Sequence, residues 1–277
     1  MAISWYPGHM HKASKQLTKT MRETDVVIEI LDARIPVASS NPMLAAICHG
    51  KPIIQILNKA DLADDICTLR WQRDLNLKSG RTCLTNGKNN ILSLGDIIKA
   101  ANTLAGQEGL PNKANRTLVI VGIPNVGKST LLNKLADRKL AKTGNEPAIT
   151  KGQQRIRLDE KWYLIDTPGM LWPKLEDQTN AYKLAMLGTI RNTAVEPEDI
   201  AWFAAELLIE KYLPALQERY QFGNTIENAE QLMQLISQTR GGLQKGGRAN
   251  LYKTAEILLN DVRSGKLGKL SFELPSD

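Results

Sequence analysis

One short segment of this sequence has the residue types that hold phosphate groups. Gly122–Ser129 reads Gly-Ile-Pro-Asn-Val-Gly-Lys-Ser, a G-x-x-x-x-G-K-[ST] pattern whose backbone N–H groups converge on phosphate oxygens. An apolar segment precedes it and a helical one follows, so a helix N-terminus adds a favourable dipole. We expect Lys128 to neutralise the outer phosphates and Ser129 to ligate Mg²⁺. Further nucleotide contacts are expected from Val126, Gly127 and Thr130.

A magnesium site needs a second protein anchor, and the sequence offers one downstream. Asp166-Thr167-Pro168-Gly169 follows the apolar segment Trp162–Ile165. We expect Asp166 to hold Mg²⁺ through water and the Gly169 N–H to meet the γ-phosphate. Between the two motifs, the Thr150 hydroxyl is positioned to complete the metal shell when a triphosphate is bound.

Asn58-Lys59-Ala60-Asp61 predicts that the base is guanine. It follows the apolar run Ile53–Leu57, at a strand end where α/β sheets bind ligands. The Asp61 carboxylate can accept from the ring N–H and the exocyclic amine of guanine, whereas adenine presents neither donor and would leave it unpaired. Lys59 can lie along the purine face, and Asn58 can tie this loop to the phosphate loop. At the next strand GTPases usually place a Ser-Ala-Lys-like segment whose backbone N–H contacts the guanine oxygen; this sequence has Cys83-Leu84-Thr85 there, and by that likeness we expect Thr85 and Asn86 beside the base.

Short apolar segments alternate with amphipathic ones through the first two-thirds of the chain, which predicts an α/β fold with a mostly parallel six-stranded sheet. The predicted strands are Val26–Leu31, Ile53–Leu57, Arg81–Leu84, Thr117–Val121, Gln153–Leu158 and Trp162–Ile165. The predicted helices are Pro42–Cys48, Ala63–Leu75, Asn90–Leu104 and Lys128–Ala136. The last two strands are joined only by Asp159–Lys161, so we expect them to form an antiparallel hairpin.

The pattern changes after Lys174, where helical periods continue without a convincing strand. The expected helices are Glu176–Leu187, Glu196–Tyr212, Thr225–Ile236 and Arg248–Val262. We therefore divide the chain into a nucleotide-binding domain, residues 1–175, and a small all-helical domain, residues 176–277. The linker-like segment 106–116 joins two blocks of the first domain.

The order of the motifs is unusual, because Asn58–Asp61 precedes Gly122–Ser129 whereas most GTPases have the reverse. Such a circular permutation is tolerable because domain termini often lie close together. The motifs Trp5–Met10, Asp32–Pro36, Asn41–Pro42 and Asp166–Lys174 add to the pattern. Together they resemble the circularly permuted GTPases of the YlqF/RbgA type over essentially the whole chain.

This resemblance implies a GTPase that acts in maturation of the large ribosomal subunit and binds rRNA-rich precursor particles. In a permuted domain the γ-phosphate loop runs directly into the C-terminal helices. We therefore expect GTP hydrolysis to reposition the helical domain. The alternatives are a switch that binds a protein effector and a P-loop ATPase or kinase, of which the latter is disfavoured by Asp61.

Hydrolysis is expected to be slow without help. Many GTPases place a water-orienting Gln after Asp-x-x-Gly, but this sequence has Met170. Lys128 and Gly169 remain as catalytic groups, and His9 could position the water if the N-terminus folds over the γ-phosphate; its alternative is a surface or capping histidine. Asn125 matches a position of potassium-activated GTPases, so the resemblance implies that K⁺ could supply charge.

The composition fits a soluble protein with a modest positive excess, 36 Lys and Arg against 29 Asp and Glu. Two groups of basic residues could grip RNA phosphates, although a solvated basic face is the simpler reading of either alone. The groups are Lys12, Lys15, Lys19 and Arg22, and Arg240, Lys245, Arg248, Lys253, Arg263, Lys266 and Lys269. Neither a signal pattern, an apolar span nor a prenylation box is visible. We expect a cytoplasmic monomer with its three cysteines reduced.

Overall fold

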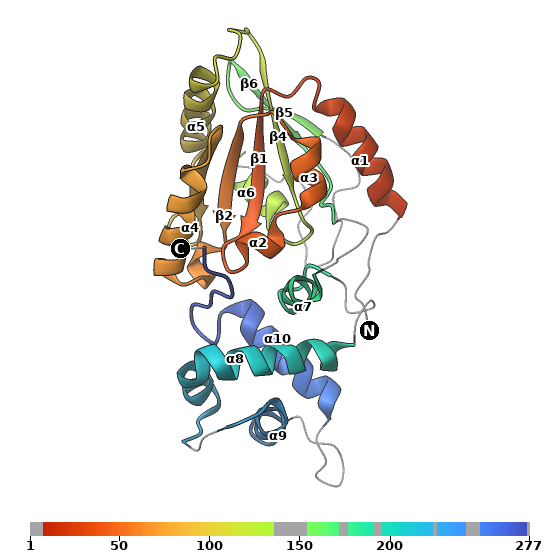
Figure 1. Cartoon of the computed structure of the whole chain (residues 1–277), viewed down its shortest axis with the longest axis vertical. Coiled ribbons are helices and arrows are strands. Elements are labelled where there is room, and N and C mark those ends of the chain that lie inside the picture. Colours follow the sequence, from red (N-terminus) through yellow and green to blue (C-terminus); the bar gives the residue numbers. More distant parts are fainter. Residues whose placement is uncertain are drawn as a thin grey trace. The chain divides into compact units, whose positions relative to one another are not determined.

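A computed structural model describes residues 8–135, 154–171, 177–190, 196–223, 226–241 and 250–275. The chain forms two compact units, shown in Figure 1. The α/β unit extends to Lys174 and also takes the tail that starts at Ser271, and the helical unit is Leu175–Leu270. The division expected from the sequence put this tail in the helical domain, and the structure corrects that point.

Six strands build one sheet in the order β3-β2-β1-β4-β6-β5. Their bounds are β1 Val26–Asp32, β2 Ile53–Asn58, β3 Arg81–Asn86, β4 Arg116–Gly122, β5 Gln154–Arg157 and β6 Trp162–Asp166. All neighbours are parallel except β5 and β6, which form the predicted antiparallel hairpin. The α/β fold class is therefore confirmed. Because β1, β2, β4 and β6 end side by side, the loops that follow them meet at one edge.

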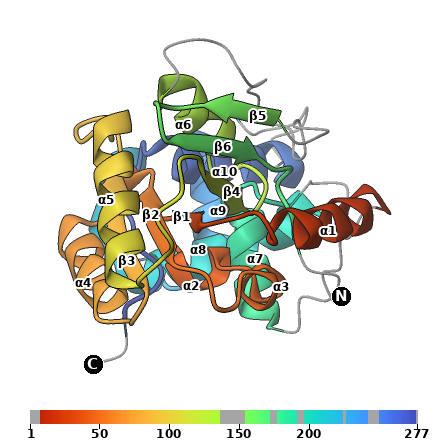
Figure 2. The same ribbon diagram turned by 90° about the horizontal axis from the view of Figure 1, so that it is seen from above.

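Helices cover both faces of the sheet, so every residue of β1, β2 and β4 is buried. Figure 2 shows α5 (Leu94–Gln107) and α6 (Lys128–Leu135) on one side, and α1 (Gly8–Thr20) and α3 (Pro42–Ile47) on the other. Helix α1 was not among the predicted helices, although its basic residues recur at helical spacing. Its Leu17, together with Met21 just after the helix, enters a core cluster with residues of β1, β4 and α3.

Side-chain caps set where several helices begin. Asn41 accepts from two backbone N–H groups of α3, and Asp64 accepts from the Cys67 N–H of α4 (Asp65–Asn76). Ser93 and Asp96 form a capping box at the start of α5, which shifts that start from the predicted Asn90. Two short elements, α2 (Pro36–Ser39) and the 3₁₀ turn η1 (Ala60–Leu62), were not predicted. Both follow a strand of the sheet directly and are too short to show a period.

The helical unit contains α7 (Gln178–Met186), α8 (Pro197–Tyr220), α9 (Ala229–Thr239) and α10 (Leu251–Ser264). Helix α8 continues past its predicted end at Tyr212, where it kinks. Pro214 explains the kink, because its ring clashes with the preceding turn and it lacks an N–H. Within the described ranges, none of the helices has the length and apolar character needed to span a bilayer.

Asp261 of α10 ties two helices of this unit together. Its carboxylate is 3% exposed and accepts from the Arg219 guanidinium at 2.8 and 3.1 Å and from the Tyr220 hydroxyl at 3.2 Å. Burial raises the pKa of Asp261, but hydrogen bonds and charge from Arg219 outweigh it, so the net pKa lies below the ordinary value. The cluster is therefore built for the ionised carboxylate.

We expect Asp261→Ala to lower the free energy of unfolding of the helical unit by about 2 kcal/mol, because Arg219 and Tyr220 lose a buried partner. Urea denaturation followed by circular dichroism measures this, with exposed Glu256→Ala on the same helix as the matched control. Because the folded pKa of Asp261 is depressed, its contribution is present above the ordinary carboxyl pKa and is lost as the pH falls through the folded value. A difference between variant and parent that persisted in acid would contradict this account.

Candidate nucleotide-binding site

The phosphate loop lies between β4 and α6, as the sequence predicts. Asn125 and Gly127 both have left-handed φ values, 56° and 103°, which bend the backbone tightly before α6. The Lys128 side chain is buried, and its Nζ donates to the carbonyl oxygens of Gly122 and Ile123, both at 3.0 Å. The lysine thus folds back over its own loop.

Burial lowers the pKa of Lys128 to about 8, and the nearby Asp166 carboxylate opposes that shift. A buried ammonium whose hydrogen bonds reach only backbone carbonyls is poorly compensated. Phosphate oxygens would compensate it far better, as charge-assisted acceptors. The electrostatics of the free loop therefore favour an anionic ligand.

Asp166 ends β6 and is completely buried. Among the described residues, neither of its carboxylate oxygens has a hydrogen-bond partner. Burial raises its pKa, and the Lys128 charge opposes that rise. A buried carboxylate in this condition is costly unless a cation or a bound water completes it. The position therefore fits a magnesium ion held between Asp166 and the phosphate loop.

Gly169 approaches the phosphate loop closely enough that no other residue fits. A Cβ added at this position would lie 2.9 Å from the backbone of Pro124 and 3.0 Å from Lys128 Nζ. Its backbone is thus next to the ammonium that is expected to meet the outer phosphates. Two further bonds fix the segment to β4, from Thr167 Oγ1 to Ile120 O at 2.7 Å and from Met170 N to Gly122 O at 3.2 Å.

The guanine-reading loop follows β2 and is linked to the phosphate loop by hydrogen bonds. Asn58 Nδ2 donates to Val126 O at 2.7 Å, which is the tie predicted for this residue. Asn58 Oδ1 in turn accepts from Asn86 Nδ2 at 2.6 Å, and Asn86 Oδ1 accepts from Leu92 N at 3.0 Å. Both ends of the Asn86 side chain are thus engaged in holding Asn58, so we assign it a supporting role instead of the direct GTP contact predicted.

Asp61 and the segment after β3 come together on the side expected for the base. Asp61 lies in η1 and is half-buried. A Cβ added at Gly87 would lie 2.7 Å from the Asp61 backbone N, so only glycine permits this approach. Thr85 Oγ1 accepts from Asn90 Nδ2 at 2.9 Å. The loops after β2 and β3 therefore form one wall of the site.

Three residues singled out for metal binding or hydrolysis have different outcomes. Thr150 lies outside the described residues. His9 belongs to the first turn of α1; its side chain is not among those described, so its role stays a prediction. Met170 is fully buried in the core cluster with Leu17 and Val121. Its side chain cannot orient water, as predicted, and it anchors the γ-phosphate loop to the core.

Sequence analysis missed Asp32 as a site residue, although Asp32–Pro36 contributed to the family resemblance. Its buried carboxylate accepts from Lys59 Nζ at 2.9 Å and from the Arg34 guanidinium at 2.9 Å. Burial raises the pKa of Asp32, but Arg34 and Lys59 outweigh it and hold that pKa well below its usual range. The sequence feature that could have identified Asp32 is its position as an acidic residue at the carboxyl end of a predicted buried strand.

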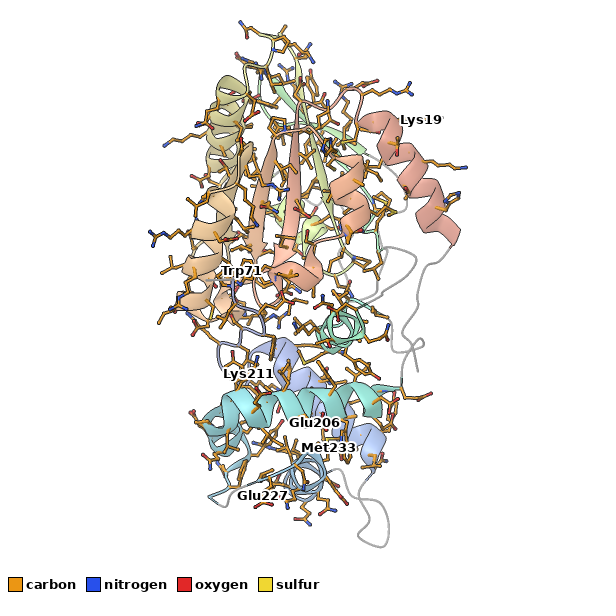
Figure 3. The ribbon with its side chains drawn as sticks, in the orientation of Figure 1. Lys19, Trp71, Glu206, Lys211, Glu227 and Met233 are labelled. Atoms are coloured by element: carbon orange, nitrogen blue, oxygen red, sulfur yellow. The ribbon has the colours of Figure 1, made fainter. Side chains whose placement is uncertain are left out.

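Some of the basic residues proposed for RNA contact are exposed, and one forms hydrogen bonds within the protein. On α1, Lys15 and Lys19 are exposed, and Figure 3 shows Lys19 on the outer side of the helix. The Lys12 side chain, Lys245 and Arg248 lie outside the described set. Arg263 donates to the carbonyl oxygens of Met186 and Ala185 at 2.8 and 2.9 Å. It caps the end of α7, so we no longer count it among the RNA-contacting residues.

Comparison with known proteins supports the assignment of the site. Residues 117–235 match the family model described as 50S ribosome-binding GTPase. The ribosome biogenesis GTPase A of Bacillus pumilus is 41% identical to this chain, with 99% of each covered. That of Bacillus cereus is also 41% identical, with all of this chain and 95% of the relative covered. GNP-bound YlqF from T. maritima is similar in structure, with a TM-score of 0.65 at 26% identity over 96% of this chain and 99% of that one.

The matched family model begins at Thr117, on the strand before the phosphate loop, and leaves the guanine-reading loop ahead of it. A parallel sheet that carries its nucleotide motifs in this order defines a circularly permuted P-loop GTPase. Near-complete coverage at 41% identity then places the chain within that class. The chain belongs to the ribosome biogenesis GTPase A family, whose members are GTP hydrolases of ribosome assembly.

Proposed function

We propose that this chain hydrolyses GTP while bound to a precursor of the large ribosomal subunit, and that it contacts rRNA there. Two observations support this proposal. The phosphate loop, the Asp166 segment and the guanine-reading loop together form one nucleotide site, and the relatives are named for ribosome biogenesis. The observation that carries GTP hydrolysis is the buried Lys128 ammonium beside Gly169, together with the Asp166 carboxylate, which has no hydrogen-bond partner among the described residues. Exposed lysines on α1 favour contact with RNA phosphates. A cytoplasmic monomer is the working form that we propose.

Each part of the site has a separate task in this proposal. Asp61 accepts the guanine donors, and Lys59 lies along the base. Lys128 and the backbone of the phosphate loop, including Gly127 and Thr130, bind the phosphates. Ser129 and Asp166 would hold Mg²⁺, with Thr150 as the further candidate, and the ion would supply positive charge to the outer phosphate oxygens.

Hydrolysis needs a group that places the attacking water, and Met170 cannot do so. Its side chain is buried, and its carbonyl accepts from Asn41 Nδ2 at 2.8 Å. The Gly169 N–H and Lys128 therefore stabilise the developing charge, while the water must be placed by another group. We propose His9 or a group of the ribosomal particle for that role. Turnover should accordingly rise when the particle is bound.

Co-sedimentation with purified large ribosomal subunits tests the proposed partner. We expect binding with a non-hydrolysable GTP analogue, weaker binding with GDP, and a steep loss as salt increases from 50 to 200 mM. A Lys15→Ala/Lys19→Ala double variant should bind less tightly, and Lys78→Ala, at an exposed lysine between α4 and β3, serves as the control. Absence of sedimentation in every nucleotide state would favour the alternative, a switch for a protein effector.

We also propose that K⁺ assists hydrolysis near Asn125, whose left-handed backbone bends the phosphate loop. Turnover by the free protein is expected to be about tenfold higher in K⁺ than in Na⁺ buffer, a small part of what an arginine finger supplies. Asn125→Gly, which removes the side chain and readily adopts the same left-handed backbone, should remove the difference while GDP affinity stays within about threefold. Phosphate release, measured with and without ribosomal subunits, gives these rates. Equal turnover in both salts would contradict the role of K⁺.

A further inference from the structure

The guanine-reading loop is held from behind by a buried ion-pair chain. Asp32 at the end of β1 lies opposite Asn58 at the end of β2 in the parallel register. Its Oδ2 accepts from Lys59 Nζ, while the Arg34 guanidinium occupies both carboxylate oxygens at 2.9 Å. Lys59 has a left-handed backbone, with φ 59°, which non-glycine residues seldom adopt. Such a backbone conformation persists only where the surrounding structure holds it, and the Asp32 ion pair is one contact that does so.

The segment around Arg34 is in turn held by the C-terminal tail. Phe272 N donates to Arg34 O at 2.9 Å. At the N-terminus of α2, the Glu273 carboxylate accepts from Val37 N at 2.7 Å and from Ala38 N at 3.2 Å. Helix α2 has no cap of its own, because its N-cap residue is Ile35. Glu273 therefore caps a helix that lies 236 positions earlier in the chain.

Trp71 of α4, labelled in Figure 3, fixes the tail from the other side. Its Nε1 donates to Glu273 O at 3.0 Å, and Ser271 Oγ accepts from Asp64 N at 3.1 Å. The tail is thus bonded both to the segment after β1 and to the start of α4. These two segments flank the loop that carries Lys59 and Asp61.

We propose that Asp32 and Arg34 are positioning residues for the guanine-reading loop, and that Phe272 and Glu273 of the tail hold them in place. The proposal rests on the proposed role of Lys59 and Asp61 in binding guanine. Asp32 directs the Lys59 ammonium away from the base, so that the stem can lie along the purine face. Arg34 keeps the Asp32 carboxylate ionised and oriented.

A positioning role predicts a selective loss. The guanine contacts are the same in substrate and transition state, so their weakening raises KM and leaves kcat unchanged. Inorganic triphosphate, which reaches only the phosphate loop, should bind equally well to parent and variant. A purely structural role would instead lower the urea midpoint without separating the two ligands.

The test compares Asp32→Asn and Glu273→Gln with the parent in the full chain. We expect the Kd for GDP to rise about tenfold for Asp32→Asn, because the neutral amide leaves the Lys59 ammonium without its charged partner, and about threefold for Glu273→Gln, with the Kd for inorganic triphosphate unchanged. Leu274→Ala, at a side chain 63% exposed in the same tail, is the matched control and should behave as the parent. If Asp32→Asn does not fold, Glu273→Gln on the half-buried tail decides.

Asp61→Asn, measured in parallel, separates this inference from the proposed function. If that variant retains full preference for guanine, the assignment of the base-reading loop is wrong. If it loses the preference while folded Asp32→Asn and Glu273→Gln bind GDP as the parent does, the positioning role alone is overturned. Equal weakening of GDP and inorganic triphosphate would likewise overturn it.

Discussion

Asp61→Asn is expected to lower the affinity for GTP about 10³-fold and to create affinity for XTP. The Asp61 carboxylate offers only acceptors, which match the ring N–H and the exocyclic amine of guanine. An asparagine offers one acceptor and one donor. Xanthine replaces the amine by a carbonyl, so the amide donor of the variant then has a partner. Competition between the two nucleotides for a fluorescent GDP analogue measures the change.

Asp65→Asn is the control for this change in preference from GTP to XTP. Asp65 is exposed in the first turn of α4, only four positions from Asp61. Its replacement by Asn removes the same charge as Asp61→Asn does. It should leave both affinities within about twofold, since surface charges at this distance are screened by salt. An Asp61→Asn variant that still preferred GTP over XTP would show that another group reads the base.

Local sequence signals are sufficient to predict most of the strands and nucleotide-binding loops of the α/β unit. Each predicted strand appears within two residues of its expected bounds. For β1, β2 and β4 the reason is that buried parallel strands are continuous apolar segments. The three-residue connection Asp159–Lys161 likewise predicted the one antiparallel pair. The nucleotide loops were predictable because their residues act through the adjoining strand end and helix start, which are local. The Asn58 tie to Val126 followed from the same motifs.

Contacts between distant segments left no such signal. Glu273 caps α2 and Phe272 pairs with Arg34 across more than 230 residues, and nothing in the tail sequence indicates its partner. For the same reason Arg263 was predicted to contact RNA with the other basic residues, whereas its side chain caps α7. A charge pattern shows that a residue is ionised but not which group it pairs with. The contacts of the C-terminal tail and the ion pairs of Asp32 with Arg34 and Lys59 therefore could not be predicted from the sequence.

Lys128→Met is the second change with a large expected effect, a loss of about 10³-fold in kcat for GTP hydrolysis. Methionine fills a similar volume but removes the ammonium that lies next to Gly169 and the phosphate loop. That charge is needed most when negative charge spreads over the outer phosphate oxygens, so kcat should fall more than GDP affinity. Single-turnover phosphate release, together with the Kd for GDP, separates the two effects.

The comparison with Lys134 shows why burial matters for this prediction. Lys134→Met, on the same helix but exposed, removes an equal charge within two helical turns and should change kcat by less than about twofold, because solvent screens it. Burial instead lowers the pKa of Lys128 to about 8 and keeps its field unscreened toward the ligand. If the two variants hydrolysed GTP equally well, Lys128 would be a structural residue of the loop, and its depressed pKa would reflect burial without catalytic use.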